Sequence, residues 1–211
     1  MVKELIIVGA GGCGREVLQW AKDVNKVSEK WVIKGFIDDD PCALDTLECS
    51  HKIIGSISDW LPSPEEVFAC GLGGPGSKKK VVELLKSRNA VFTSVIHPTA
   101  ILADTAVLGE GVIVYPSAFI SCNTKLGDFV TLLMSALGHD ASVGDYTTIS
   151  AFCDITGHVE VGRSVFMGSH VTIIPSMTIG DEAFLGAGSV VVNPIKPGVK
   201  VMGNPARKIM F

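Results

Sequence analysis

A six-residue repeat constrains this 211-residue chain more than any other feature. From residue 102 onward the chain divides into sixteen consecutive units that each begin with Leu, Ile, Val or Met, as in LGEGVI (108–113) and VGRSVF (161–166). The fifth position of a unit is mostly small or β-branched, and the second is glycine in eight units. Strand alternation has a period of 2 and an amphipathic helix a period of 3.6, so neither produces this repeat.

The repeat predicts a triangular coil with one large side chain pointing inward on each face and a turn of about 18 residues. A small side chain at position five fills the gap before the next large one. Glycine at position two fits a corner that needs a positive φ or has no room for a side chain. One unit, LLMSA (132–136), has only five residues. We therefore expect the coil to tighten or bulge just before His139.

Residues 1–95 lack the repeat and alternate between two other patterns. Apolar runs at 4–9, 31–38 and 67–71 predict strands, and the segments 15–27 and 77–88 predict helices. This βαβαβ order favours a small parallel sheet, which binds ligands at the carboxyl ends of its strands.

Glycines follow the first and third of these strands. Gly9, Gly11 and Gly14 form a G-x-G-x-x-G pattern before the first helix, whose free N–H groups suit a phosphate. Asp38 and Asp39 follow the second strand. A dinucleotide fold needs two mononucleotide halves and this segment has room for one, which favours a ligand with a single nucleotide. Glycines that serve only tight turns remain the alternative.

Composition excludes several classes of function. The net charge of -4 offers little to bind nucleic acid, and no apolar run approaches the length of a membrane span. No signal peptide is evident at the N-terminus, so we expect a cytoplasmic protein. The six cysteines are scattered without a C-x-x-C pair, which argues against a zinc cage and a disulfide framework.

The repeat resembles the left-handed parallel β-helix of the hexapeptide-repeat acyltransferases. The combination of GAGGCGRE (9–16), FIDDD (36–40), VIHPTA (95–100) and LGHD (137–140) resembles bacterial acetyltransferases of nucleotide-linked amino sugars and of sialic acid. The resemblance implies a Rossmann-like α/β domain at 1–95 that binds the sugar nucleotide. It also implies an acetyl-CoA-binding β-helix at 96–211 and a homotrimer with active sites between subunits.

The same resemblance implies roles for individual residues. His139 is expected to be the general base and Asp140 to raise its basicity, with no metal involved. The residues expected to bind the sugar nucleotide are Gly11, Gly12, Cys13, Asp38, Asp39 and Gly73, and those expected to bind acetyl-CoA are Thr148, Ser169 and Ala187. A relative in this family has histidine at the positions of Cys13 and Thr148, so the roles of these two residues are in question.

The chemistry of acetyl transfer fits the LGHD segment. An imidazole titrates near neutral pH and suits a base, and a neighbouring carboxylate orients it. Adjacent residues of a strand point to opposite faces, so contact between His139 and Asp140 requires a corner or a distorted backbone. The five-residue unit just upstream is a candidate cause of such a distortion.

Four functions remain open at this point. The leading hypothesis is acetyl-CoA-dependent N-acetylation of a nucleotide-linked amino sugar, followed by O-acetylation of sialic acid or a related sugar. A non-catalytic partner that binds nucleotide sugars is the third. The fourth is a metal enzyme like the histidine-ligated carbonic anhydrases, although the spacing of His139, His158 and His170 fits it poorly. His158 and His170 both occupy position four and could line a subunit interface or the coenzyme groove.

Overall fold

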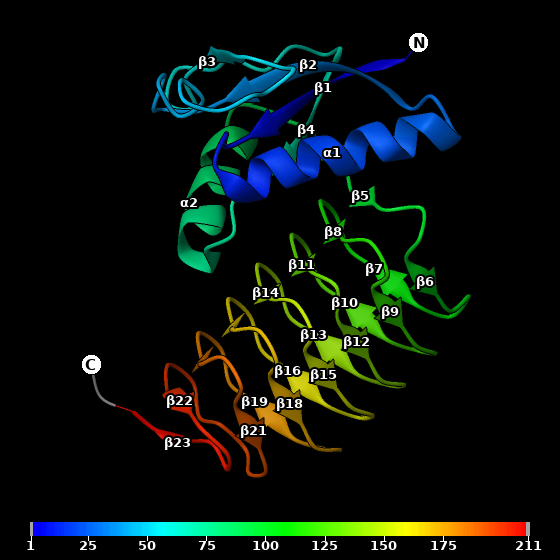
Figure 1. Cartoon of the computed structure of the whole chain (residues 1–211), viewed down its shortest axis with the longest axis vertical. Helices are drawn as coiled ribbons and strands as arrows, with labels where there is room; N and C mark the ends of the chain where they lie inside the picture. The colour runs from blue at the N-terminus through cyan, green and yellow to red at the C-terminus, as the bar shows by residue number, and fades with distance from the viewer. Residues whose placement is uncertain (1, 210–211) are drawn as a thin grey trace. The chain divides into compact units, whose positions relative to one another are not determined.

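The computed structural model describes residues 2–209 and divides into two compact units, Met1–Pro98 and Thr99–Phe211. The expected Rossmann-like unit and the expected parallel β-helix are both present, and Figure 1 shows the chain in colours that follow the sequence. Among the described residues, no helix is both long and apolar enough to cross a membrane.

The first unit contains a parallel four-stranded sheet with the strand order β3-β2-β1-β4. Its elements are β1 (Lys3–Val8), α1 (Gly12–Val27), β2 (Trp31–Ile37), β3 (Ile53–Gly55), β4 (Glu66–Cys70), α2 (Pro75–Lys86) and β5 (Val95–Ile96). The central strand β1 is buried from Leu5 to Val8, as its continuous apolar run predicts. The sequence pattern did not predict β3, a short strand at the edge of the sheet.

Both helices begin earlier than the sequence pattern indicated. Gly11 and Gly74 are the N-cap residues in extended conformations, so α1 begins at Gly12 rather than residue 15 and α2 at Pro75 rather than residue 77. Proline fits the first turn of a helix because its missing N–H has no partner there in any case. The glycine-rich segments therefore form the helix starts themselves.

The second unit is a coil of three flat faces, with one short parallel strand from each turn on each face (Figure 1). The first face contains β7 (Val107–Leu108), β10 (Lys125–Leu126), β13 (Ser142–Val143), β16 (Glu160–Val161) and β19 (Thr178–Ile179). The second face contains β8 (Ile113–Val114), β11 (Thr131–Leu132), β14 (Thr148–Ile149), β17 (Phe166–Met167), β20 (Phe184–Leu185) and β22 (Lys200–Met202), with β23 (Arg207–Lys208) antiparallel to β22. The third face contains β6 (Ile101–Leu102), β9 (Phe119–Ile120), β12 (Ala136–Leu137), β15 (Asp154–Ile155), β18 (Thr172–Ile173) and β21 (Val190–Val191).

The inward positions are those that the repeat predicts. Leu137, Ile155 and Ile173 begin successive units on the third face and are completely buried. Position five is buried in most units as well, and Thr147 at this position donates its hydroxyl to the carbonyl of Gly162. The large and small inward side chains thus fill the interior of the coil together.

The sequence analysis gave two reasons for glycine at a corner, a positive φ and a lack of space for a side chain. In the structure these two conditions occur at different positions of the unit. The left-handed backbone falls at position four, where Asp140, Tyr146 and His158 have φ near 60°. Glycine at position two serves close stacking instead, because a Cβ on Gly138 would lie 2.6 Å from the backbone nitrogen of Gly157 in the next coil. Of the two reasons offered for these glycines, the lack of space is the correct one.

The five-residue unit lacks its left-handed corner residue. The carbonyl of Met134 accepts the N–H of Phe152, and one coil later the carbonyl of Ala151 accepts the N–H of His170 in the same way. The hydroxyl of Ser135 accepts the N–H of Cys153, so Ser135, rather than the residue after it, occupies position five. The coil tightens at the corner before β12, within the five-residue unit, as the sequence predicts.

Candidate active site

His139 and Asp140 form the corner between β12 and β13. Asp140 has φ 59°, a conformation that aspartate adopts more readily than most residues. Its N–H is bonded to the carbonyl of Cys122 in the preceding coil, and the carbonyl of His139 accepts the N–H of His158 in the next. The corner has the same left-handed geometry as the others, so the shortened unit is not the cause of the His139–Asp140 contact.

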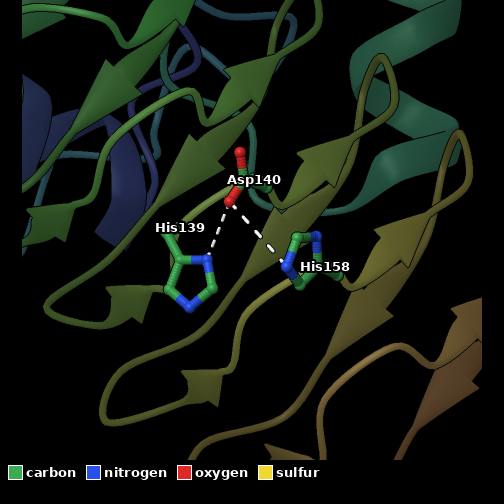
Figure 2. Close-up of side chains that lie close together, drawn as sticks. All are labelled: His139, Asp140 and His158. Atoms are coloured by element: carbon green, nitrogen blue, oxygen red, sulfur yellow. Dashed lines mark hydrogen bonds and ion pairs between the residues drawn. The ribbon is translucent and has the colours of Figure 1, made fainter.

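The corner brings the two side chains into direct contact. His139 Nδ1 lies 2.8 Å from Asp140 Oδ2 (Figure 2). Asn123 Nδ2 donates a hydrogen bond to Asp140 Oδ1 at 3.0 Å. The hydrogen bond from His139, followed by that from Asn123, lowers the pKa of Asp140. The carboxylate is therefore charged wherever an imidazole acts as a base. Nδ1 of His139 then carries the proton, and Nε2 has a free lone pair.

Gly157 provides the space in which the His139 ring lies. A Cβ at Gly157 would be 2.6 Å from Cε1 and 2.7 Å from Nε2 of His139. Sequence reasoning missed this residue, although Gly157 is the only glycine at position three of any unit. The signal was therefore present in the repeat, but it becomes interpretable only when the coils are stacked.

His158 lies on the same column of corners, 18 residues after Asp140. Its Nε2 is 3.9 Å from Asp140 Oδ2, and its ring is edge-on to that of His139 with centroids 5.1 Å apart (Figure 2). Within residues 2–209, these three side chains form the one group of His, Cys, Asp and Glu close enough together to hold a metal ion. His170 lies at another corner, stacked on Phe152, so the three-histidine set of a carbonic anhydrase is not assembled within one chain.

Two of the residues expected to bind acetyl-CoA, Ser169 and Ala187, lie at a different corner of the coil. Ser169 is at the corner between β17 and β18, and its carbonyl accepts the N–H of Gly188, the residue after Ala187. Thr148 is buried in β14, one coil earlier on the adjoining face. The third face separates this corner from His139, because β18 runs from one corner column to the other.

In the first unit, the loops after β1, β2 and β4 meet at one edge of the sheet. Gly11 caps α1, and Gly12 and Cys13 form its first turn. Asp38 accepts the N–H of Ala10 at 2.7 Å and thereby ties the loop after β2 to the glycine loop.

Two further expected residues follow β2 and β4. Asp39 accepts the N–H of Ser58 at 2.8 Å. Gly73 precedes α2 and has open space where a Cβ would be. Gly71, just before it, has no such space, since a Cβ there would lie 2.5 Å from Gly14 Cα. The close approach of the two glycine loops therefore depends on Gly71 and Gly14.

Lys78 is a buried charged residue that the sequence analysis did not single out. It lies in α2 and is completely buried. Burial lowers the pKa of Lys78 to about 8, and burial also raises the pKa of the Cys70 thiol to about 11. In the sequence Lys78 begins a run of three lysines, a pattern typical of solvated charge.

Comparison with known proteins matches both halves of the chain. Residues 4–85 match the family described as the PglD N-terminal domain. The GDP-perosamine N-acetyltransferase of Escherichia coli O157:H7 is 27% identical over 212 residues, which cover 96% of this chain and 95% of the relative. Along almost its whole length the chain is thus similar to an acetyltransferase of the hexapeptide-repeat kind. The resemblance stated from the sequence is thus confirmed.

Two solved structures share the fold. PerB from Caulobacter crescentus, solved in complex with CoA and GDP-perosamine, aligns with a TM-score of 0.89 and 23% identity over 100% of this chain and 99% of its own. The acetyltransferase domain of PglB from Neisseria gonorrhoeae, solved with acetyl coenzyme A, aligns with a TM-score of 0.89 and 23% identity over 99% and 100%.

Proposed function

We propose that this protein transfers the acetyl group of acetyl-CoA to the amine of a nucleotide-linked amino sugar, with His139 as the general base. The observation that carries the proposal is the 2.8 Å contact between His139 Nδ1 and Asp140 Oδ2, which leaves Nε2 to accept a proton. The similarity to a GDP-perosamine N-acetyltransferase along almost the whole chain supports an amine as the acceptor.

In the proposed reaction His139 acts twice. Nε2 accepts a proton from the sugar amine as its nitrogen attacks the thioester carbonyl and forms the new C–N bond. The imidazolium is stabilised by the Asp140 carboxylate. When the C–S bond breaks, the leaving CoA thiolate takes the proton from His139, which restores the base. Protons and electron pairs balance, and the step needs neither a metal nor an oxidant.

The two units divide the substrates in this proposal. Residues 1–95 bind the sugar nucleotide through Gly11, Gly12, Cys13, Asp38, Asp39 and Gly73, which lie on the loops after β1, β2 and β4. A helix start with free N–H groups at this edge suits a pyrophosphate. Residues 96–211 bind acetyl-CoA, with Ser169 and Ala187 on one corner column and Thr148 on the adjoining face.

The separation of the two corner columns supports a homotrimer. Within one chain the third face lies between His139 and Ser169, so a site that needs both corners requires a second subunit. In a trimer around a threefold axis, the corner that contains His139 in each β-helix would lie next to the corner that contains Ser169 in a neighbouring subunit. We place this assembly in the cytoplasm, where acetyl-CoA and nucleotide sugars are available.

The proposal is tested with purified protein, acetyl-CoA and amino sugars linked to UDP, GDP or dTDP, with release of free thiol as the measurement. We expect thiol release with at least one amino sugar and none with the matching sugar that has a hydroxyl in place of the amine. Release only with hydroxyl acceptors would indicate an O-acetyltransferase. Binding of nucleotide sugar without any thiol release would contradict an enzymatic role.

A further inference from the structure

One oxygen of Asp140 is approached by two imidazoles. His139 Nδ1 lies 2.8 Å from Oδ2 and His158 Nε2 lies 3.9 Å from the same atom. The other oxygen, Oδ1, accepts a hydrogen bond from Asn123. Asn123, Asp140 and His158 all occupy position four of their units and have φ between 57° and 59°. Their spacing of one coil fixes the arrangement, and Figure 2 shows the contacts of Asp140 with both imidazoles.

The second imidazole is accessible and close to the first. The side chains of His139 and His158 are each 59% exposed, and their ring centroids lie 5.1 Å apart. A proton on His158 would therefore place a positive charge next to both the base and its carboxylate.

The other charged groups at this corner are of opposite sign. Lys125 and Glu160 line the same hollow of about 470 Å³ as Asp140 and His158. They lie on β10 and β16, on either side of β13, so they partly cancel each other's effect on His158. Asp140 and His139 are the remaining titratable groups that face His158 among the residues that border it.

We infer that His158 is a positioning residue that shares the Asp140 carboxylate with His139 and sets the lower pH limit of acetyl transfer. When protonated, His158 repels a second proton from His139 and so preserves the neutral base at acidic pH. When it is uncharged, His158 adds no such repulsion and has little effect on the rate. The inference rests on the proposed function, because His139 must be the base for its protonation to limit the rate.

The size of the effect follows from the distance. Two unit charges about 5 Å apart in a solvated site interact by an amount that corresponds to roughly half a pH unit. Salt at about 1 M shortens the screening length to about 3 Å and removes most of this interaction. The effect is therefore a shift along the pH axis that depends on ionic strength.

The experiment compares kcat at saturating substrates from pH 5 to 9 for the wild type, His158→Gln and His158→Lys. We expect the pH of half-maximal kcat on the acid side to be lowest for His158→Lys and highest for His158→Gln. The expected difference between these variants is about half a pH unit at low salt and much less at 1 M salt. All three proteins share the same substrates, so substrate ionisation cancels in the comparison.

Ser164 provides the matched control. It also occupies position four of a unit, but it lies at the corner between β16 and β17, which contains neither His139 nor Ser169. Ser164→Gln and Ser164→Lys should leave the acid midpoint of kcat unchanged.

Two results would overturn the inference. The first is equal acid midpoints for the wild type and both His158 variants, with transfer otherwise intact. The second is a loss of kcat of more than about 100-fold at every pH in His158→Gln, which would indicate direct contact with the reacting groups. Failure of the proposed function looks different, because the wild type itself would then show no acetyl transfer.

Discussion

The two units assemble their candidate sites in different ways. In the β-helix, residues about 18 positions apart lie on top of one another, so Asp140 and His158 meet because the coil repeats. In the first unit, Gly11, Asp38 and Gly73 meet only because the strand order β3-β2-β1-β4 places three strand ends side by side. In a periodic coil, contacts can be inferred from the number of residues between two positions. In an open sheet, contacts depend on the order of all its strands.

The difference between the two units can be tested first at a glycine that lets successive coils stack closely. In Gly138→Ala the new Cβ would clash with backbone atoms of the next coil. These atoms cannot shift easily, because their own hydrogen bonds hold them in place. We expect a loss of about 3 kcal/mol or more in the free energy of unfolding, measured by denaturant titration at fixed protein concentration. Unchanged stability would show that the coils are not stacked as tightly as described.

The buried lysine tests the first unit. Because burial lowers the pKa of Lys78 to about 8 in the folded protein, the unfolded chain binds more protons between pH 8 and about 10.5. Raising the pH through this window therefore stabilises the folded state. Between pH 7 and 10 we expect the unfolding free energy of the wild type to rise by about 2–3 kcal/mol relative to Lys78→Met.

The pH dependence, not the absolute stability of Lys78→Met, is the decisive quantity in that experiment. The variant also loses the hydrogen-bonding ability of the amine, which changes stability equally at each pH. Lys79→Met, on the neighbouring exposed lysine, is the control and should follow the wild type. Parallel curves for the wild type and Lys78→Met would contradict a buried, destabilised charge.

A substitution at Gly157 should affect catalysis without affecting the stability of the coil. In Gly157→Ala the new Cβ would meet the exposed ring of His139 rather than backbone, so the ring is displaced while the coil remains intact. We expect kcat to fall by about 10- to 100-fold, with a change of less than about 1 kcal/mol in unfolding free energy. An unchanged kcat would show that the ring need not lie over residue 157.

Sequence reasoning was most successful where contacts repeat. The inward positions and the three faces followed from the six-residue period, whereas the family came from a resemblance of several motifs in both units. The proximity of His158 to Asp140 was available from their spacing of 18. The corners were less predictable, because the left-handed position accepts Asp, Tyr, Phe and His, which carry no glycine signal. The position of Ser135 became clear only from its hydrogen bonds across coils.

The first unit was harder to predict because its determinants are not local. The strand β3 has only three residues, too few to show an alternating pattern. Lys78 resembles its exposed neighbours in the sequence, and only the packing of α2 buries it. Asp38 was expected to contact a ligand. In the structure it accepts a hydrogen bond from the N–H of Ala10, a role that no sequence pattern indicated.

The most direct test of the account is the effect of His139→Gln on each step of the reaction. Glutamine keeps a polar side chain of similar reach but cannot accept and return a proton at neutral pH. We expect kcat to fall by about 100- to 10,000-fold, while the dissociation constants of acetyl-CoA and the sugar nucleotide change less than about threefold. A kcat within a few fold of the wild type would contradict the assignment of His139 as the base.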